Sequence, residues 1–175
     1  MNIWDEIQTM EDFEEFKRQL LDLDSSFNFK CRKCGKCCKN QNEILFSPRD
    51  IFRIAQKLEQ SPLEILKSCT EIYIGQQSRI PVVHLLMQGQ KNACPFLSEH
   101  NLCSIHDVKP FVCALYPLGR VMTYETIDSP AVKENAVRYV MSINCGSAKK
   151  RHTVRKWLAE FGIPENDEFF FYGPK

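Results

Sequence analysis

The sequence predicts an α+β fold: a small, loop-rich single domain with several helices and a short antiparallel sheet, organised around a cluster of cysteines. The length of 175 residues is that of one ordinary domain, and the hydrophobic fraction of 43% can supply a core. Short segments with helical or extended patterns are separated by loops. Nine cysteines form the largest compositional anomaly, about three times the usual number for a cytosolic chain of this length.

The helices are indicated by capping signals or by apolar residues at helical spacing. Near the N-terminus, Phe13, Phe16 and Leu20 recur at the spacing of one helix face. Two later segments begin with Ser-Pro followed by an acidic residue, which is typical of a helix start. The last helical pattern ends at Gly162. The expected helices cover residues 10–22, 48–58, 62 to 69 or 73, and 153–161.

Extended segments are expected at 44–46, 81–87 and 136–143, where apolar and β-branched residues are concentrated. The stretch between 94 and 117 has no clear periodicity and is expected to be rich in loops. We divide the chain into an acidic N-terminal helical extension, a cysteine-cluster domain and a C-terminal tail. Their expected boundaries are 1–28, 29–162 and 163–175.

The charge pattern gives no reason to expect a polyanionic partner. The net charge is +1, so nucleic acid is disfavoured unless a local basic patch binds it. The N-terminus lacks the pattern of a signal peptide, and no segment has the roughly 18 consecutive apolar residues of a membrane span. These features predict a soluble, cytoplasmic protein that does not bind a membrane.

The cysteines are predicted to bind metal rather than to form disulfides. Their number is odd, no secretion signal is present, and four of them fall within the eight residues 31–38. In a reducing compartment, clustered free thiols usually hold a metal ion. The cysteines lie at positions 31, 34, 37, 38, 69, 94, 103, 113 and 145.

The spacing within the run specifies the kind of site. Cys31, Cys34 and Cys37 follow the C-x2-C step that lets neighbouring thiolates reach one zinc ion or one iron–sulfur cluster. Cys38 directly follows Cys37, and side chains of adjacent extended residues diverge. The pair is therefore expected to serve two metal positions or to bridge them. Cys69, on a predicted helix, is interpreted as an ordinary core residue.

The residues around the run leave more than one function open. Five lysine and arginine residues flank these cysteines and could stabilise thiolates. They could also contact RNA, which the near-neutral total charge disfavours. Among the histidines, His106 is the one potential ligand close to a cysteine, Cys103. The sequence contains no phosphate-binding loop and no nucleophile elbow, so catalysis stays undecided.

Several motifs follow one another in order: the run 31–38, the segment 44–55, Cys94-Pro95-Phe96-Leu97, Cys103-Ser104-Ile105-His106, Lys109-Pro110-x-x-Cys113-x-x-Tyr116-Pro117 and Cys145-Gly146. This ordered set resembles that of the YkgJ-type cysteine-cluster family, also called the CxxCxxCC domain. The resemblance covers about residues 29–160 and implies a zinc- or iron-chelating protein. By position, it implies eight metal-ligating cysteines: Cys31, Cys34, Cys37, Cys38, Cys94, Cys103, Cys113 and Cys145.

Three positions depart from the family pattern. Lys109 replaces a usual arginine, Ala114 stands where an arginine often follows a cysteine, and His106 replaces a common tyrosine. These departures argue against a role that requires a guanidinium, and they leave thiolate ligation intact.

The sequence favours a metal-binding protein that chelates zinc or iron, including the alternative of an iron–sulfur cluster, through these eight thiolates. One further hypothesis is a metal-dependent redox or group-transfer enzyme that uses the cluster. Another is a binding module that meets a protein or RNA partner. The metal, the number of sites, the partner and the oligomeric state do not follow from the sequence.

Overall fold

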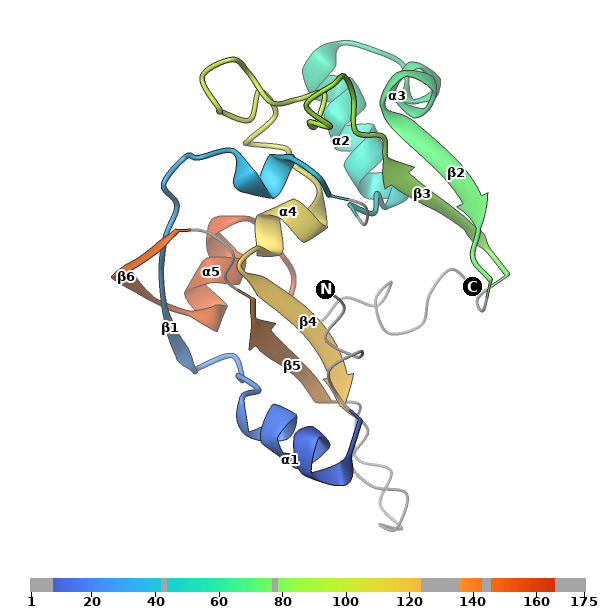
Figure 1. Cartoon of the computed structure of the whole chain (residues 1–175). Helices are drawn as coiled ribbons and strands as arrows, with labels where there is room; N and C mark the ends of the chain where they lie inside the picture. Colours follow the sequence, from blue (N-terminus) through green and yellow to red (C-terminus); the bar gives the residue numbers. More distant parts are fainter. Residues whose placement is uncertain (1–7, 42–43, 77–78, 124–135, 143–145, 166–175) are drawn as a thin grey trace.

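The computed structural model describes residues 8–41, 44–76, 79–123, 136–142 and 146–165 (Figure 1). These residues form five α-helices, one short 3-10 helix (η2) and six strands, which confirms the predicted α+β class. The helices are α1 (Met10–Arg18), η2 (Lys36–Cys38), α2 (Pro48–Leu58), α3 (Pro62–Cys69), α4 (Phe111–Leu115) and α5 (Val154–Glu160). The strands are β1 (Ser26–Lys30), β2 (Thr70–Ile74), β3 (Pro81–Leu85), β4 (Leu118–Thr123), β5 (Ala136–Met141) and β6 (Ser147–Thr153).

Helices α2 and α3 begin at the two predicted Ser-Pro signals. In each, the serine hydroxyl accepts a hydrogen bond from the backbone N–H three residues later, and an acidic side chain accepts one from the serine N–H. These capping boxes satisfy N–H groups that the first helical turn leaves without partners. Helix α2 ends at Leu58, as expected. Helix α3 ends at Cys69, the shorter of its two expected ends, and β2 follows at once.

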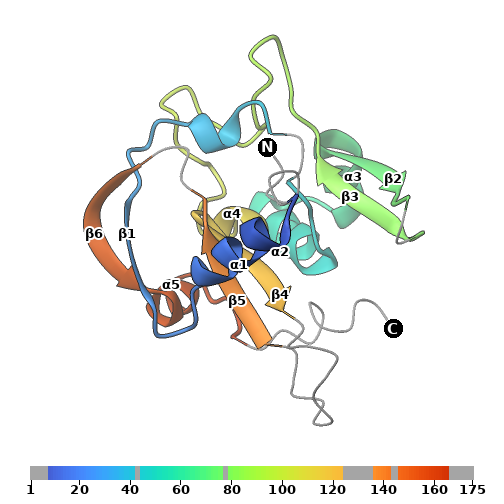
Figure 2. The same cartoon turned by 60° about the horizontal axis from the view of Figure 1, so that its bottom comes forward.

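The strands form three separate antiparallel pairs within the described residues: β1 with β6, β2 with β3, and β4 with β5. Strand β3 also contacts the extended segment around Leu45 through a bridge to His84. The β1–β6 pair and the β2–β3 hairpin lie on opposite sides of the molecule in both views (Figures 1 and 2). Strand β1 crosses the boundary that the sequence suggested between residues 28 and 29.

The buried side chains form two hydrophobic clusters. The first, here called the β1–α5 cluster, consists of Phe27, Phe29, Ala114, Leu115, Leu118, Tyr139, Val154, Trp157, Leu158 and Ile163. The second, the α2–α3 cluster, consists of Phe46, Ile51, Ile54, Ala55, Ile65, Cys69, Leu85, Phe96 and Ile105. Burial of Cys69 in the second cluster agrees with its interpretation as a core residue.

Asp50 connects the start of α2 to the start of α4. Its Oδ2 accepts hydrogen bonds from the backbone N–H and the hydroxyl of Ser47, and its Oδ1 accepts one from the Phe111 N–H at 3.0 Å. The carboxylate is almost fully buried, so these bonds offset the cost of removing it from water.

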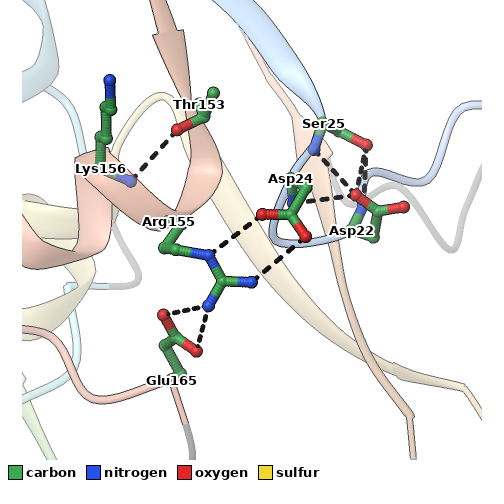
Figure 3. A network of polar contacts seen from close by, with 7 residues as sticks. All are labelled: Asp22, Asp24, Ser25, Thr153, Arg155, Lys156 and Glu165. Carbon is green, nitrogen blue, oxygen red and sulfur yellow. Dashed lines mark hydrogen bonds and ion pairs between the residues drawn. The ribbon is translucent and has the colours of Figure 1, made fainter.

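An exposed polar network ties the turn before β1 to the segment after α5 (Figure 3). The Arg155 guanidinium donates to both carboxylate oxygens of Asp24 and to both of Glu165. These two carboxylates raise the pKa of Arg155 further above its ordinary value. Because the network is exposed, we assign it a role in positioning the turn more than in stability.

Several elements differ from the sequence-based expectation. Strands β1, β2, β4 and β6 and helix α4 were not expected, and the helix expected over 10–22 ends at Arg18. The strand expected over 81–87 ends at Leu85, and the one expected over 136–143 ends at Met141. None of the described helices combines the length and the apolar character that crossing a membrane requires.

Candidate metal centre

The cysteine run leaves β1 and turns sharply before η2. Lys33 and Gly35 both have left-handed backbone conformations, with φ of 55° and 68°. The turn directs the Lys33 N–H toward Cys31 Sγ at 3.3 Å. The turn therefore brings a backbone donor next to one of the predicted ligands.

Gly35 has no room for a side chain. A Cβ atom there would lie 2.9 Å from Asn101 Oδ1, and that oxygen also accepts a hydrogen bond from Lys39 Nζ at 3.1 Å. Asn101 thus anchors the run to the loop that carries Cys94 and Cys103.

The end of the run lies beside the segment that carries Cys94. The Cys94 N–H donates to the Cys38 carbonyl at 2.8 Å, and the Asn40 N–H donates to the Asn92 carbonyl at 2.9 Å. Lys39 and Ala93 form an antiparallel bridge between these contacts. Residues separated by more than 50 positions in the chain are therefore neighbours here.

Cys103 and Cys113 reach the same region from two further elements. A bridge between Leu97 and Cys103, together with the Ser104 N–H bond to the Phe96 carbonyl, folds the 94–104 loop back on itself. Cys113 lies on α4, whose start is held by the Asp50 contact.

Three of these thiols share a poorly solvated environment. Burial raises the pKa of Cys94 to about 11 and that of Cys113 to about 12. Burial also raises the pKa of Cys103. For Cys113, the neighbouring thiols of Cys94, Cys103 and Cys37 raise it further, which shows that they lie within electrostatic range of one another.

The adjacent pair Cys37 and Cys38 differs in acidity. Their Sγ atoms are 3.9 Å apart, and a hydrogen bond from Cys38 lowers the pKa of Cys37 to about 6. The same contact, followed by burial, raises the pKa of Cys38. A thiolate on Cys37 and a proton on Cys38 is therefore the favoured arrangement near neutral pH.

Lys109 is a half-buried cation among these thiols. Its Nζ lies 4.0 Å from the centroid of the Phe161 ring, a cation–π contact. Burial lowers the pKa of Lys109, whereas the thiols of Cys113, Cys103, Cys31 and Cys37 raise it. Lys109 therefore supplies positive charge in the region where metal-bound thiolates would accumulate negative charge.

The structure brings together five of the eight predicted ligands: Cys37, Cys38, Cys94, Cys103 and Cys113. Cys31 is exposed. It lies within electrostatic range of Lys109, as Cys37, Cys103 and Cys113 also do. Cys34 is half-buried in the same turn. Cys145 lies outside the described residues.

The gathered thiols do not form a finished coordination shell. Among the described residues, no three Cys, His, Asp or Glu side chains lie close enough together to bind one ion. The donor chemistry nevertheless fits zinc or iron, because thiolates are preferred ligands of both and a lysine offsets their charge. His106 packs on the Phe161 ring at 6.4 Å between centroids.

Lys109 and Asn101 are the residues that sequence reasoning did not place at this site. The Lys109-Pro110 step was visible only as a departure from the family's Arg-Pro. Nothing in the sequence indicated that Asn101 would contact the cysteine run, because this contact depends on tertiary folding.

A cavity of about 250 Å³ is lined by Gln41, His84, Leu85, Leu86, Met87 and Asn92. None of these residues is a predicted ligand. His84 Nε2 lies 3.1 Å from Glu71 Oε2, and its Nδ1 has no hydrogen-bond partner in the described part of the chain.

The α+β fold, with thiols that come together from a cysteine run, a loop and a helix, is that of a cysteine-cluster protein. The model of the CxxCxxCC family, described as a "putative zinc- or iron-chelating domain", matches residues 30–140. This match covers more than half of the chain, which therefore belongs to that family. Searches of curated proteins and of solved structures each found no match.

Proposed function

We propose that this protein binds zinc or iron through the thiolates of Cys31, Cys34, Cys37, Cys38, Cys94, Cys103, Cys113 and Cys145. The observation that carries the proposal is the common electrostatic environment of thiols from three separate segments: the run, the 94–104 loop and α4. Eight thiolates are enough for two four-coordinate positions. The adjacent pair Cys37 and Cys38 would then contribute one ligand to each position.

The raised pKa values of Cys94 and Cys113 support binding that is coupled to proton release. Both thiols are protonated at neutral pH in the absence of a cation, because their pKa values are about 11 and 12. A bound metal ion must displace these protons before it can form bonds to sulfur. Metal affinity should therefore increase with pH through the neutral range.

The experiment is anaerobic purification of the full chain, followed by elemental analysis and a visible absorption spectrum. Stoichiometric zinc in a colourless protein would favour zinc sites, and iron with inorganic sulfide and visible absorption would favour an iron–sulfur cluster. Zinc added to the reduced apoprotein in weak buffer should release protons.

Serine variants of Cys94 and Cys113 should lose metal, whereas Cys69→Ser should retain the full amount. Cys69 is the matched control because it is a cysteine of the same region that lies in the α2–α3 cluster. Equal metal content in all three variants would contradict the proposed ligand set.

Free thiols of this kind stay reduced in a reducing compartment, which supports a cytoplasmic location.

A further inference from the structure

The basic residues of the chain are concentrated in two segments that the fold pairs. Residues 25–42 contain five lysines or arginines and residues 135–159 contain six, and neither segment contains an aspartate or a glutamate. Strands β1 and β6 belong to these segments and pair with each other. All 22 acidic residues therefore lie in the rest of the chain, so the net charge of +1 conceals a separation of charge.

Seven of these basic side chains are exposed on β1, on β6 and on the run that leaves β1. The two phenylalanines of β1 enter the core, whereas Ser26, Asn28 and Lys30 are exposed. Arg151 pairs with Asn28 and donates to the Ser26 hydroxyl at 3.1 Å, so it lies on the same outward face. Strands β1 and β6 form one side of the molecule in both views (Figures 1 and 2). The seven residues, here called the basic face, are Lys30, Arg32, Lys33, Lys36, Lys149, Lys150 and Arg151.

No acidic neighbour balances the charge of the basic face. None of its seven residues forms an ion pair with any residue that the structure describes. Elsewhere, Lys17, Lys57 and Arg155 each pair with a carboxylate. A surface of one charge sign attracts ligands of the opposite sign, and salt screens this attraction.

The thiols do not account for the basic face either. Lys109 already supplies positive charge among the gathered cysteines. Strand β6 carries three of the seven cations and no cysteine. These three are therefore available to a ligand outside the chain.

The side chains around the basic face indicate which kind of anionic partner fits it. Protein interfaces have an apolar centre, and proteins that bind membrane surfaces insert apolar side chains. Among the described residues, no large hydrophobic side chain is exposed on β1, on β6 or in the run 31–38. Interfaces with nucleic acid are polar and strongly positive. The basic face therefore fits nucleic acid better than an acidic protein or a membrane.

The positions of the aromatic rings favour a duplex over a single strand. Proteins bind unpaired bases by stacking them on exposed aromatic rings. Phe27 and Phe29 are buried, and the half-buried His152 ring is stacked on Phe27. In a duplex the bases stack on one another, and the phosphates present one negative charge per ~1.7 Å of helix axis.

We propose that the basic face binds a nucleic-acid duplex through its phosphates. Contacts with phosphates position a protein on nucleic acid without reading its sequence. Duplexes of DNA and of RNA, and duplexes of different sequence, should therefore bind with similar affinity. The cations of β6 are not predicted metal ligands, so this inference does not depend on the proposed function.

The test is fluorescence anisotropy of a labelled DNA duplex of mixed sequence, titrated with the full reduced chain at several salt concentrations. The wild-type chain should bind with a dissociation constant of about 1–100 μM near physiological salt, and more tightly at lower salt. The double variant Lys149→Gln with Lys150→Gln should weaken binding about tenfold or more at low salt. Because each lost phosphate contact lowers the salt slope by about 1, the slope should fall by about 2.

The matched control is the double variant Lys67→Gln with Lys91→Gln. Both lysines are exposed and lie outside the basic face, on α3 and in the loop before Cys94. The control removes the same net charge and should leave the affinity and the salt slope unchanged. Circular dichroism and elemental analysis should show the wild-type fold and metal content in both double variants.

Three results would overturn the proposal. The first is no change in anisotropy up to about 100 μM protein, the weak limit of non-specific binding to nucleic acid. The second is equal weakening by both double variants, which would assign binding to total charge. The third is tighter binding to the unpaired strand, or binding to vesicles of anionic lipid without binding to the duplex. A chain that binds the duplex but no metal would refute the proposed function and support this inference.

Discussion

At the residue scale, the acidity of Cys37 depends on its neighbour. The hydrogen bond from Cys38 is the main cause that lowers the pKa of Cys37 to about 6, and Lys109 contributes a smaller part. A thiolate reacts with alkylating agents far faster than a thiol does. Cys37 is also exposed, so it should be the most reactive of these cysteines near neutral pH.

We therefore predict that Cys38→Ala shifts the alkylation profile of Cys37 to higher pH. In the reduced apoprotein, the rate of reaction with iodoacetamide should have its midpoint near pH 6, the pKa of Cys37. The variant lacks the S–H donor that stabilises the thiolate, so its midpoint should rise. Mass spectrometry of fragment ions measures the modification of each cysteine.

Cys94 provides the internal reference for this experiment. Its pKa of about 11 predicts slow alkylation until strongly alkaline pH, both in the wild-type chain and in the variant. An unchanged Cys37 profile in Cys38→Ala would show that Cys38 does not control the acidity of Cys37.

The sequence predicts which side chains are candidate metal ligands better than it predicts which residues surround those ligands. The spacing of Cys31, Cys34 and Cys37 indicates a metal site by itself, because C-x2-C is a local pattern. The contact between Asn101 and Gly35, and the position of Lys109 among the thiols, depend on distant segments meeting. No local spacing encodes such contacts.

At the scale of elements, α2 and α3 start with the same capping box but in different surroundings. The Asp50 carboxylate is buried and has the third hydrogen bond from Phe111. Glu64 makes the two equivalent contacts with Ser61 in an exposed position. The comparison separates the effect of the cap itself from that of the contact between α2 and α4.

We predict that Asp50→Ala lowers the free energy of unfolding by about 3 kcal/mol, because it removes the cap and leaves the Phe111 N–H without its acceptor. Glu64→Ala, the matched control, should cause a markedly smaller loss, since water replaces its exposed contacts. Urea denaturation followed by circular dichroism measures both. Similar losses would mean that the contact with α4 adds nothing to the cap.

The elements that the sequence predicts are those with local signals. The starts of α2 and α3 follow from Ser-Pro and an acidic residue, and both were located correctly. Strand β6, Ser-Ala-Lys-Lys-Arg-His-Thr, is polar and has no apolar alternation. It is a strand because it pairs with β1, whose Phe27 and Phe29 enter the core. Tertiary pairing overrides local preference in such segments.

At the scale of the whole molecule, the candidate ligands belong to both hydrophobic clusters. Cys94 and Cys103 pack against the α2–α3 cluster. Cys113 lies on α4, whose Ala114 and Leu115 belong to the β1–α5 cluster. A metal bound by thiols from both sides would therefore cross-link the two clusters.

We predict that metal makes the two clusters unfold as one cooperative unit. A ligand that binds only the folded state stabilises it by about 4 kcal/mol when its free concentration is a thousand times the dissociation constant.

With metal, hydrogen exchange of α2 and of α5 should report the same free energy of opening. After chelation, the two values should fall and separate, because the clusters would then be joined only by contacts that do not involve metal, such as Asp50 with Phe111 and Lys109 with Phe161. Cys113→Ser should separate them even with metal present, whereas Cys69→Ser should not. Equal opening energies in the chelated wild-type chain would show that the clusters are coupled without metal.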